Sequence, residues 1–117
     1  MKKINVVKNS RDFDKIIKNG KMVKNHHFVI YYDNNDLSIY RFGISVGKKI
    51  GNAVVRNYYK RVLRNVCDNH KNLYSKTRDY IIIIRKACTL LSFNEMEESF
   101  VYLINKIEKE KRNEEKC

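Results

Sequence analysis

The sequence predicts a single α+β domain, a small sandwich in which helices pack on one sheet. Three observations support this: the chain has the length of one domain, helix-like and strand-like stretches alternate along it, and Asp79–Arg85 is an uninterrupted apolar run of central-strand length. The expected order is α-(β)-β-β-α-β-α over residues 1–117, with about 109–117 as a fraying tail.

The first helix is expected over residues 11–19, after an irregular basic lead-in over residues 1–9. Ser10 offers an N-cap, and Gly20 suits the position after the last turn. The helix has one face to bury, a narrow apolar stripe made by Phe13, Ile16 and Ile17.

Three strands are expected next. A short one lies around Met22 and Val23, and His27–Tyr32 is rich in β-branched and aromatic residues on both faces. Residues 33–36 favour a turn into a strand at about Ile39–Val46. We therefore expect the last two of these strands to form an antiparallel hairpin.

Gly51–Asn65 is predicted to be a helix with two opposed faces, capped by Asn52. Cations at i, i+4 and i+8 form a row with no acid among them, which favours a polyanion lying along it. The alternative is a face that only keeps the helix soluble, but an ordinary solvated face mixes signs. The basic face holds Arg56, Asn57, Lys60, Arg61 and Arg64; Lys48 and Lys49 extend it, and the apolar face holds Val55, Tyr58, Tyr59, Val62, Leu63 and Val66.

The C-terminal part is predicted to be a strand and a helix. Asp79–Arg85 suits a strand buried on both faces and commonly parallel to its neighbour, with the basic helix as its crossover. Ser92 and Glu95 make an S-x-x-E capping box before a helix whose buried face holds Met96, Phe100, Leu103, Ile104 and Ile107.

The charge balance also favours a polyanionic partner. Lys and Arg number 25 against 13 Asp and Glu, a net charge of +12 that suits nucleic acid or an anionic membrane surface. No apolar run approaches the roughly 20 residues that span a bilayer, and we see no secretory signal, so we expect no membrane partner. Three cysteines without a C-x-x-C pair suggest free thiols in a reducing cytosol and a cytoplasmic protein.

The sequence encodes no recognisable active site. It contains no metalloprotease, nucleophile-elbow or phosphate-loop motif, so we expect no catalytic residue and no metal ligand. Asp12 and Asp14 are explained more simply by the positive end of the first helix than by a bound metal. His26 and His27, adjacent on a strand, point to opposite faces.

The aromatic residues near the first helix allow two interpretations. Phe13 and Tyr31 belong most simply to the core. Alternatively, Phe13 and Ile17 flank an exposed sheet face that carries Val29 and Tyr31, with Lys15, Lys18, Lys21 and Lys24 nearby. Aromatic faces beside cations bind unstacked bases of a single strand.

The segment Arg41–Asn65, RFGISVGKKIGNAVVRNYYKRVLRN, resembles the protein component of bacterial ribonuclease P. The resemblance extends to the stretch from Asp12 to Gly20, to Phe28–Tyr31 and to Asp79–Ile83. It implies an α/β sandwich resembling domain 2 of ribosomal protein S5, with a left-handed βαβ crossover. It also implies membership of a ribonucleoprotein endoribonuclease that matures tRNA 5′ ends, in which the RNA carries the catalysis.

The resemblance assigns partners and contact residues as well. It implies a catalytic RNA bound by Lys48, Lys49, Asn52, Arg56, Asn57, Lys60, Arg61 and Arg64, and a precursor-tRNA 5′ leader bound by Phe13, Ile17 and Tyr31. Mg²⁺ would enter only through the RNA, and we expect a monomer in a 1:1 complex. Two positions depart from the family pattern: Tyr58 stands where the family usually has Arg, and Ile17 where it often has an aromatic residue.

Two other functions remain open from the sequence. One is a ribosomal or RNA-chaperone-type RNA-binding protein of the same fold. The other is a nuclease active without RNA, against which the missing carboxylate cluster argues.

Overall fold

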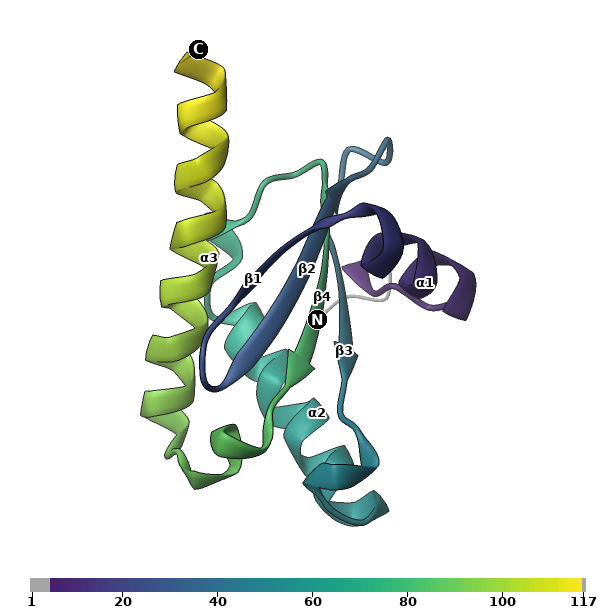
Figure 1. The fold of residues 1–117 in the computed structure, drawn as a ribbon, viewed down its shortest axis with the longest axis vertical. Helices are drawn as coiled ribbons and strands as arrows, with labels where there is room; N and C mark the ends of the chain where they lie inside the picture. The colour runs from purple at the N-terminus through teal and green to yellow at the C-terminus, as the bar shows by residue number, and fades with distance from the viewer. Residues whose placement is uncertain (1–4, 117) are drawn as a thin grey trace.

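A mixed sheet of four strands in the order β1-β2-β4-β3 forms the centre of the molecule. In this computed structural model residues 5–116 are described, with side chains as far as Lys109. Helix α1 lies on one face of the sheet, and α2 and α3 pack on the other (Figure 1). The elements are α1 (Ser10–Asn19), β1 (Lys21–Lys24), β2 (Phe28–Asn34), β3 (Arg41–Ser45), α2 (Ala53–Asp68), β4 (Arg78–Ile84) and α3 (Phe93–Lys116), with short 3₁₀ turns at Lys48–Ile50, Lys71–Leu73 and Lys86–Leu90.

The last strand in the sequence, β4, occupies the middle of the sheet. It pairs antiparallel with β2 and parallel with β3, so the β3–α2–β4 connection is a crossover, and it is left-handed (Figure 1). The predicted hairpin of β2 with β3 is therefore wrong. The apolar run Tyr80–Ile84 is buried almost throughout and takes the central position, which separates the two strands that precede it.

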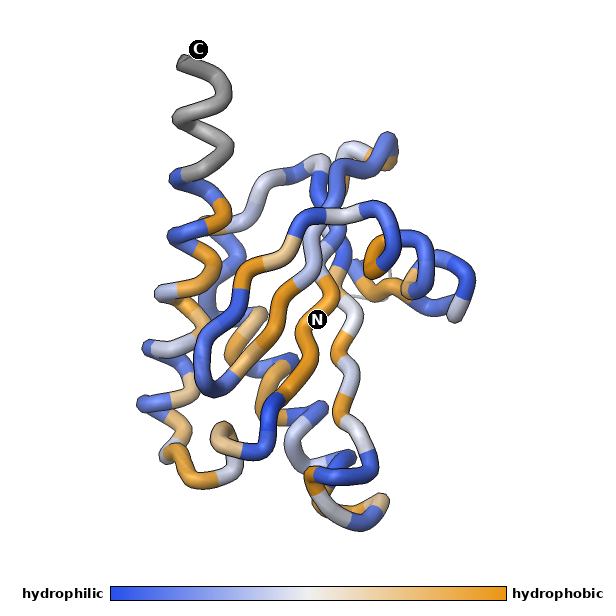
Figure 2. The backbone as a smooth tube through the Cα atoms, viewed as in Figure 1, coloured by the Kyte–Doolittle hydropathy of each residue, from blue (hydrophilic) through white to orange (hydrophobic). Residues whose placement is uncertain are grey.

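The main core lies between the sheet and helices α2 and α3. The five predicted core residues of α3, from Met96 to Ile107, are all buried, and the strands meet them with Phe28, Ile30 and Ile82. The ring of Phe42 stacks on that of Tyr80 at a centroid distance of 4.7 Å. Figure 2 shows the apolar stretches of the strands and α3 converging in this layer.

Helix α1 packs on the other face through a smaller cluster of Val7, Ile16 and Ile81. Its N-cap is Asn9, whose Oδ1 accepts the Asp12 N–H at 2.8 Å, one residue earlier than expected. Gly20 ends the helix in an extended conformation. A Cβ there would come within 2.5 Å of the Ile16 carbonyl oxygen, so glycine permits a close approach of backbones.

In the lead-in predicted to be irregular, residues 1–4 lie outside the described residues, and residues 5–9 are more ordered than predicted. Val6 forms a parallel bridge with Phe42, the Val7 N–H donates to the Phe42 carbonyl at 2.9 Å, and Val7 is buried. This segment thus covers part of the free edge of β3.

Helix α3 is fixed at both ends of its packed region. Its first turn has the predicted capping box, with the Ser92 N–H donating to Glu95 and the Glu95 N–H to Ser92 Oγ. Farther along, buried Arg78 and Tyr80 both donate to Glu108 Oε1, at 3.1 and 2.7 Å. The segment predicted to be a fraying tail, residues 109–117, continues α3 as far as Lys116, and Cys117 lies outside the described residues.

Two further expectations concern thiols and membranes. Cys67 and Cys88 are free, as predicted, and both are buried. Among the helices of residues 5–116, none combines the length and apolar character that crossing a membrane requires.

Candidate nucleic-acid interface

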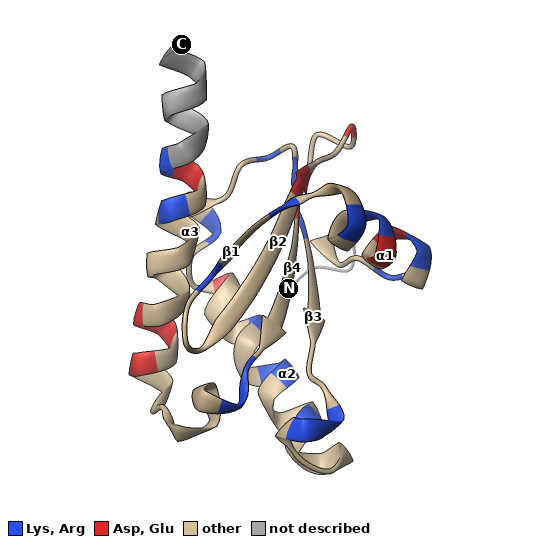
Figure 3. Ribbon diagram, in the orientation of Figure 1, with Lys and Arg blue, Asp and Glu red and all other residues tan. Residues whose placement is uncertain are grey.

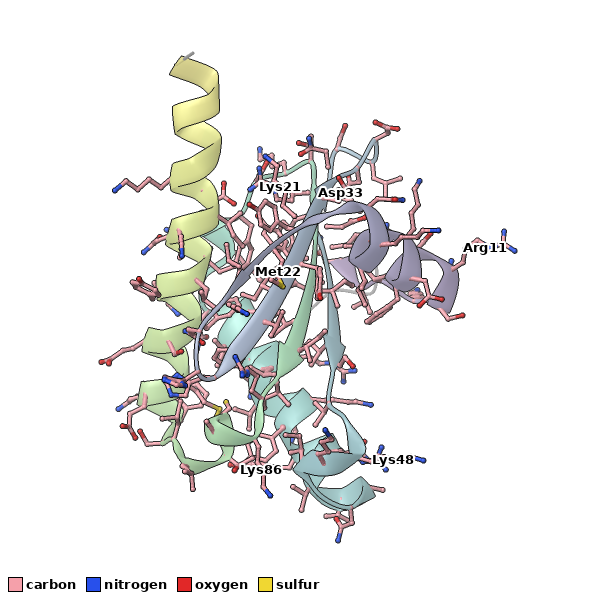
Figure 4. All side chains as sticks on the ribbon, in the orientation of Figure 1. Arg11, Lys21, Met22, Asp33, Lys48 and Lys86 are labelled. Atoms are coloured by element: carbon pink, nitrogen blue, oxygen red, sulfur yellow. The ribbon has the colours of Figure 1, made fainter. Side chains whose placement is uncertain are left out.

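Helix α2 begins as the sequence predicts. Asn52 is its N-cap, and its Oδ1 accepts the Val55 N–H at 3.1 Å. The 3₁₀ turn Lys48–Ile50 leads into this end of the helix, and the Lys48 side chain extends away from the body of the protein (Figure 4). The turn therefore adds two ammonium groups to the end of α2 where free N–H groups and the helix dipole already favour anions.

The predicted cations form one surface along α2 and the turn before it. Figure 3 shows Lys and Arg gathered on this part of the molecule. Arg61 and Arg64 are exposed, while Arg56 and Lys60 are half-buried. We call this the basic surface, and its members, all at least partly exposed, are Lys48, Lys49, Asn52, Arg56, Asn57, Lys60, Arg61 and Arg64.

No acid neutralises the basic surface within the described residues. The ion pairs among the described residues lie away from the basic surface. They join Arg41 to Asp12 and Asp79, Arg78 to Glu108, and His70 to Glu97. The Nε atom of Arg56 is buried and has no hydrogen-bond partner among the described residues. Acids gather instead on the early turns of α3 (Figure 3). Charges are thus segregated, which leaves the basic surface available to a polyanion.

The opposite face of the sheet is only partly covered. Helix α1 packs against β2 and β4, while Met22 on the edge strand β1 is 44% exposed. Strand register places one row of side chains across this face, in the order Met22, Tyr31, Ile81 and Gly43. We call this the open sheet face.

The three predicted leader contacts all border the open sheet face. Phe13 and Tyr31 pack against the cluster around Ile81 and are half-buried. Each ring therefore contributes to the small core and also exposes part of its surface. Ile17, one helical turn after Phe13, is 37% exposed. The face therefore offers two aromatic rings and one aliphatic side chain beside the lysines of α1 and β1.

An ion-pair network fixes α1 over this face. The Arg41 guanidinium donates to both carboxylate oxygens of Asp79, at 2.9 and 2.7 Å, and to Asp12 on α1 at 3.3 Å. The hydrogen bonds with Asp79 raise the pKa of Arg41 above its ordinary value. Because Asp12 precedes Phe13, this network ties the position of the Phe13 ring to the sheet.

The basic surface and the open sheet face meet at the edge strand β3. Arg64, at the far end of the basic row, lines a hollow of about 100 Å³ together with Phe13, Gly43 and Ile44. The sequence did not predict this meeting, because it depends on β3 being the edge strand between α1 and α2. The only local signal was the glycine at position 43, which leaves room for Phe13 against the strand.

Tyr58 does not lie where the helical pattern placed it. We assigned it to the apolar face of α2, but it is 48% exposed, and Val54 is 78% exposed. The buried residues of α2 are Leu63, Val66 and Cys67, in its second half. The first turns extend past the ends of the strands (Figure 1), so they have no sheet to cover their apolar residues.

Across the described residues, no group of three or more His, Cys, Asp or Glu side chains is arranged to hold a metal ion. Asp12 binds Arg41 instead, a partner that we did not predict.

Comparison with known proteins agrees with this geometry. The family model for Ribonuclease P matches residues 1–108. A Mycoplasma mycoides protein named ribonuclease P protein component is 43% identical over 108 residues, covering 92% of this chain and 99% of that one. One of the same name from Bacillus velezensis is 43% identical over 117 residues, covering 99% of this chain and 100% of that one.

Solved structures show the same fold. The ribonuclease P protein of Staphylococcus aureus superposes with a TM-score of 0.80 at 37% identity, over 90% of this chain and 95% of that one. The ribonuclease P protein of Thermotoga maritima superposes with a TM-score of 0.80 at 31% identity, over 86% of this chain and 94% of that one.

Proposed function

The chain belongs to the family of bacterial ribonuclease P protein components, and from that premise we propose how it acts in the ribonucleoprotein. The basic surface binds the catalytic RNA, and the open sheet face holds the single-stranded 5′ leader of precursor tRNA. The RNA, with Mg²⁺ bound to it, removes the leader, while the protein contributes no catalytic side chain. The protein acts in the cytoplasm as a monomer in a 1:1 complex with the RNA.

One observation carries this proposal: a continuous row of cations on α2 that no described acid neutralises. Such a row repels itself, and a polyanion lying along it removes the repulsion. With roughly six phosphate contacts, the logarithm of affinity falls against the logarithm of salt concentration with a slope of about −4 to −5.

The basic surface and the open sheet face meet at β3, which supports the proposal that one binds the catalytic RNA and the other the leader. Arg64 and Phe13 line the same hollow although they belong to different helices. A single-stranded leader bound on the open sheet face therefore runs close to the catalytic RNA bound on α2.

Reconstitution tests the proposal directly. The purified protein is added to its cognate ribonuclease P RNA at low Mg²⁺, and leader removal from precursor tRNA is followed. We expect faster cleavage with both components than with RNA alone, and none with protein alone. Cleavage by protein alone would favour an independent nuclease, and tight ribosomal-RNA binding without an effect on cleavage would favour a ribosomal or chaperone role.

A further inference from the structure

An exposed aromatic side chain borders the basic surface. Tyr58 follows Asn57 on α2, and about half of its surface is exposed. Val54, one turn earlier, and Arg61, nearly one turn later, lie on the same side of the helix. Tyr58 and Val54 thus form an exposed apolar patch that borders the basic surface next to Arg61.

The ring of Tyr58 is held in place from its own helix. It meets the Tyr59 ring edge to face, at a centroid distance of 5.2 Å and an interplanar angle of 76°. Tyr59 packs against the main core, so it forms a fixed support. The guanidinium carbon of Arg61 lies 6.0 Å from the Tyr58 centroid. A ring already positioned by such neighbours loses little conformational freedom when a ligand packs on it.

We propose that Tyr58 is a stacking platform for one unpaired base of the RNA that α2 binds, an inference that rests on the proposed function. A phenol ring carries no positive charge, so against phosphates it offers only a single hydrogen bond from its hydroxyl group. Stacking on a base, in contrast, uses its flat apolar face. Arg61 then supplies the nearby phosphate contact, so that Tyr58 binds the base and Arg61 the backbone of one nucleotide.

Exposure alone does not make this assignment, and a second tyrosine shows why. Tyr102 on α3 is even more exposed, at 63%. It lines hollows with Glu97, Glu98 and Ser99, where an RNA backbone is repelled. Tyr58 differs because its neighbours attract RNA, and Tyr102 is therefore the matched control.

Salt dependence separates stacking from a phosphate contact. Tyr58→Ala is expected to weaken binding of the cognate ribonuclease P RNA about 5- to 150-fold, the range for losing one base–aromatic stack, with an unchanged salt slope. Tyr58→Phe, which keeps the ring, is expected to bind like the unchanged protein. Tyr58→Arg should steepen the slope by about 0.7 to 0.9 because it adds a phosphate contact. Circular dichroism confirms that each variant is folded.

A fluorescent variant reports the stack itself. The chain has no tryptophan, so Tyr58→Trp introduces a single one. Its emission should be quenched when the RNA binds, while that of Tyr102→Trp should change little.

Opposite results overturn the inference without touching the proposed function. Unchanged affinity in Tyr58→Ala, or equal losses in Tyr58→Ala and Tyr58→Phe, would show that no base stacks on the ring, even if the protein still stimulates cleavage. If the unchanged protein neither binds the RNA nor stimulates cleavage, the proposed function itself fails.

Discussion

The ring of Phe13 lies so close to Gly43 that a Cβ added to Gly43 would come within 2.5 Å of the Phe13 Cζ atom. The same Cβ would stand 2.7 Å from Ile81 Cδ1, so α1 and β4 leave no room for it. This contact sets the height of α1 above the sheet at the border of the proposed leader site.

Gly43→Ala should therefore destabilise the protein by about 1–3 kcal/mol, as overpacking of a filled site does. It should also weaken binding of leader-bearing precursor tRNA more than that of mature tRNA, because Phe13 is displaced. Urea denaturation measures the first effect. Adding Phe13→Ala should relieve part of the clash, so the double variant is expected to lose less than the sum of the single losses. Strict additivity would contradict this interpretation.

Arg56→Ala with Arg64→Ala should weaken RNA binding with little change in melting temperature. Removing two phosphate contacts is expected to make the salt slope less steep by about 1.4 to 1.8. Arg64 is exposed, and the buried Nε of Arg56 has no hydrogen bond among the described residues to lose. Lys71→Ala with Lys106→Ala, two exposed cations outside the basic surface, is the control. A large fall in melting temperature only in the arginine variant would show that the basic surface is structural.

Tyr31→Leu should weaken binding of leader-bearing precursor tRNA several-fold, because leucine keeps the apolar packing but lacks an aromatic face for a base. Binding of mature tRNA, which has no leader, should be unchanged. Fluorescence anisotropy of the two RNAs in the reconstituted complex measures the difference. Tyr102→Leu on α3 serves as the control, and equal losses for both RNAs would exclude a leader contact at Tyr31.

Ile17→Phe should have the opposite effect. Ile17 is partly exposed at the border of the open sheet face, so a larger ring there adds stacking surface without entering the core. We expect tighter binding of the leader-bearing RNA only, measured by the same anisotropy titration. Ile17→Leu, an aliphatic change of similar volume, should leave the affinity unaltered; equal gains from leucine would point to bulk apolar contact.

The capping box of α3 should give a pH-dependent contribution to stability. Hydrogen bonds from the backbone and side chain of Ser92 lower the pKa of Glu95. Because the folded pKa lies below the unfolded value, this stabilisation is complete above the unfolded value and is lost as pH falls through the folded one. The difference in melting temperature between the unchanged protein and Glu95→Ala should therefore shrink below about pH 4.3. Glu98→Ala, which removes no capping bond, should show no such trend, and a pH-independent effect of Glu95→Ala would contradict the assignment.

The local elements and the basic row were predictable because both depend on short-range periodicity. The cap at Asn52, the core face of α3 and the cations of α2 each follow from residue spacing within a single helix. The pairing of strands was not predictable in this way. Neighbouring strands usually pair, and nothing near Tyr32 or Arg41 shows that residues 78–84 come between them.

The site was predictable to a similar degree. Helical spacing assigned Arg56, Lys60 and Arg64 to one surface, but it also assigned Tyr58 to the apolar face, although 48% of Tyr58 is exposed. A helical wheel gives the direction of a side chain and says nothing of where the neighbouring sheet ends. The hollow shared by Arg64 and Phe13 required the same knowledge of the sheet edge.

The central position of β4 has a consequence for synthesis on the ribosome. When β1, β2 and β3 have emerged, only the first two form a strand pair, because β3, apart from its bridge to Val6, bonds to a strand that has not yet been translated. The cationic helix that follows β3 then also lacks the completed layer on which it packs. Arrival of residues 78–84 closes the sheet in one late step, so nascent chains stalled before this point should remain open to proteases and chaperones.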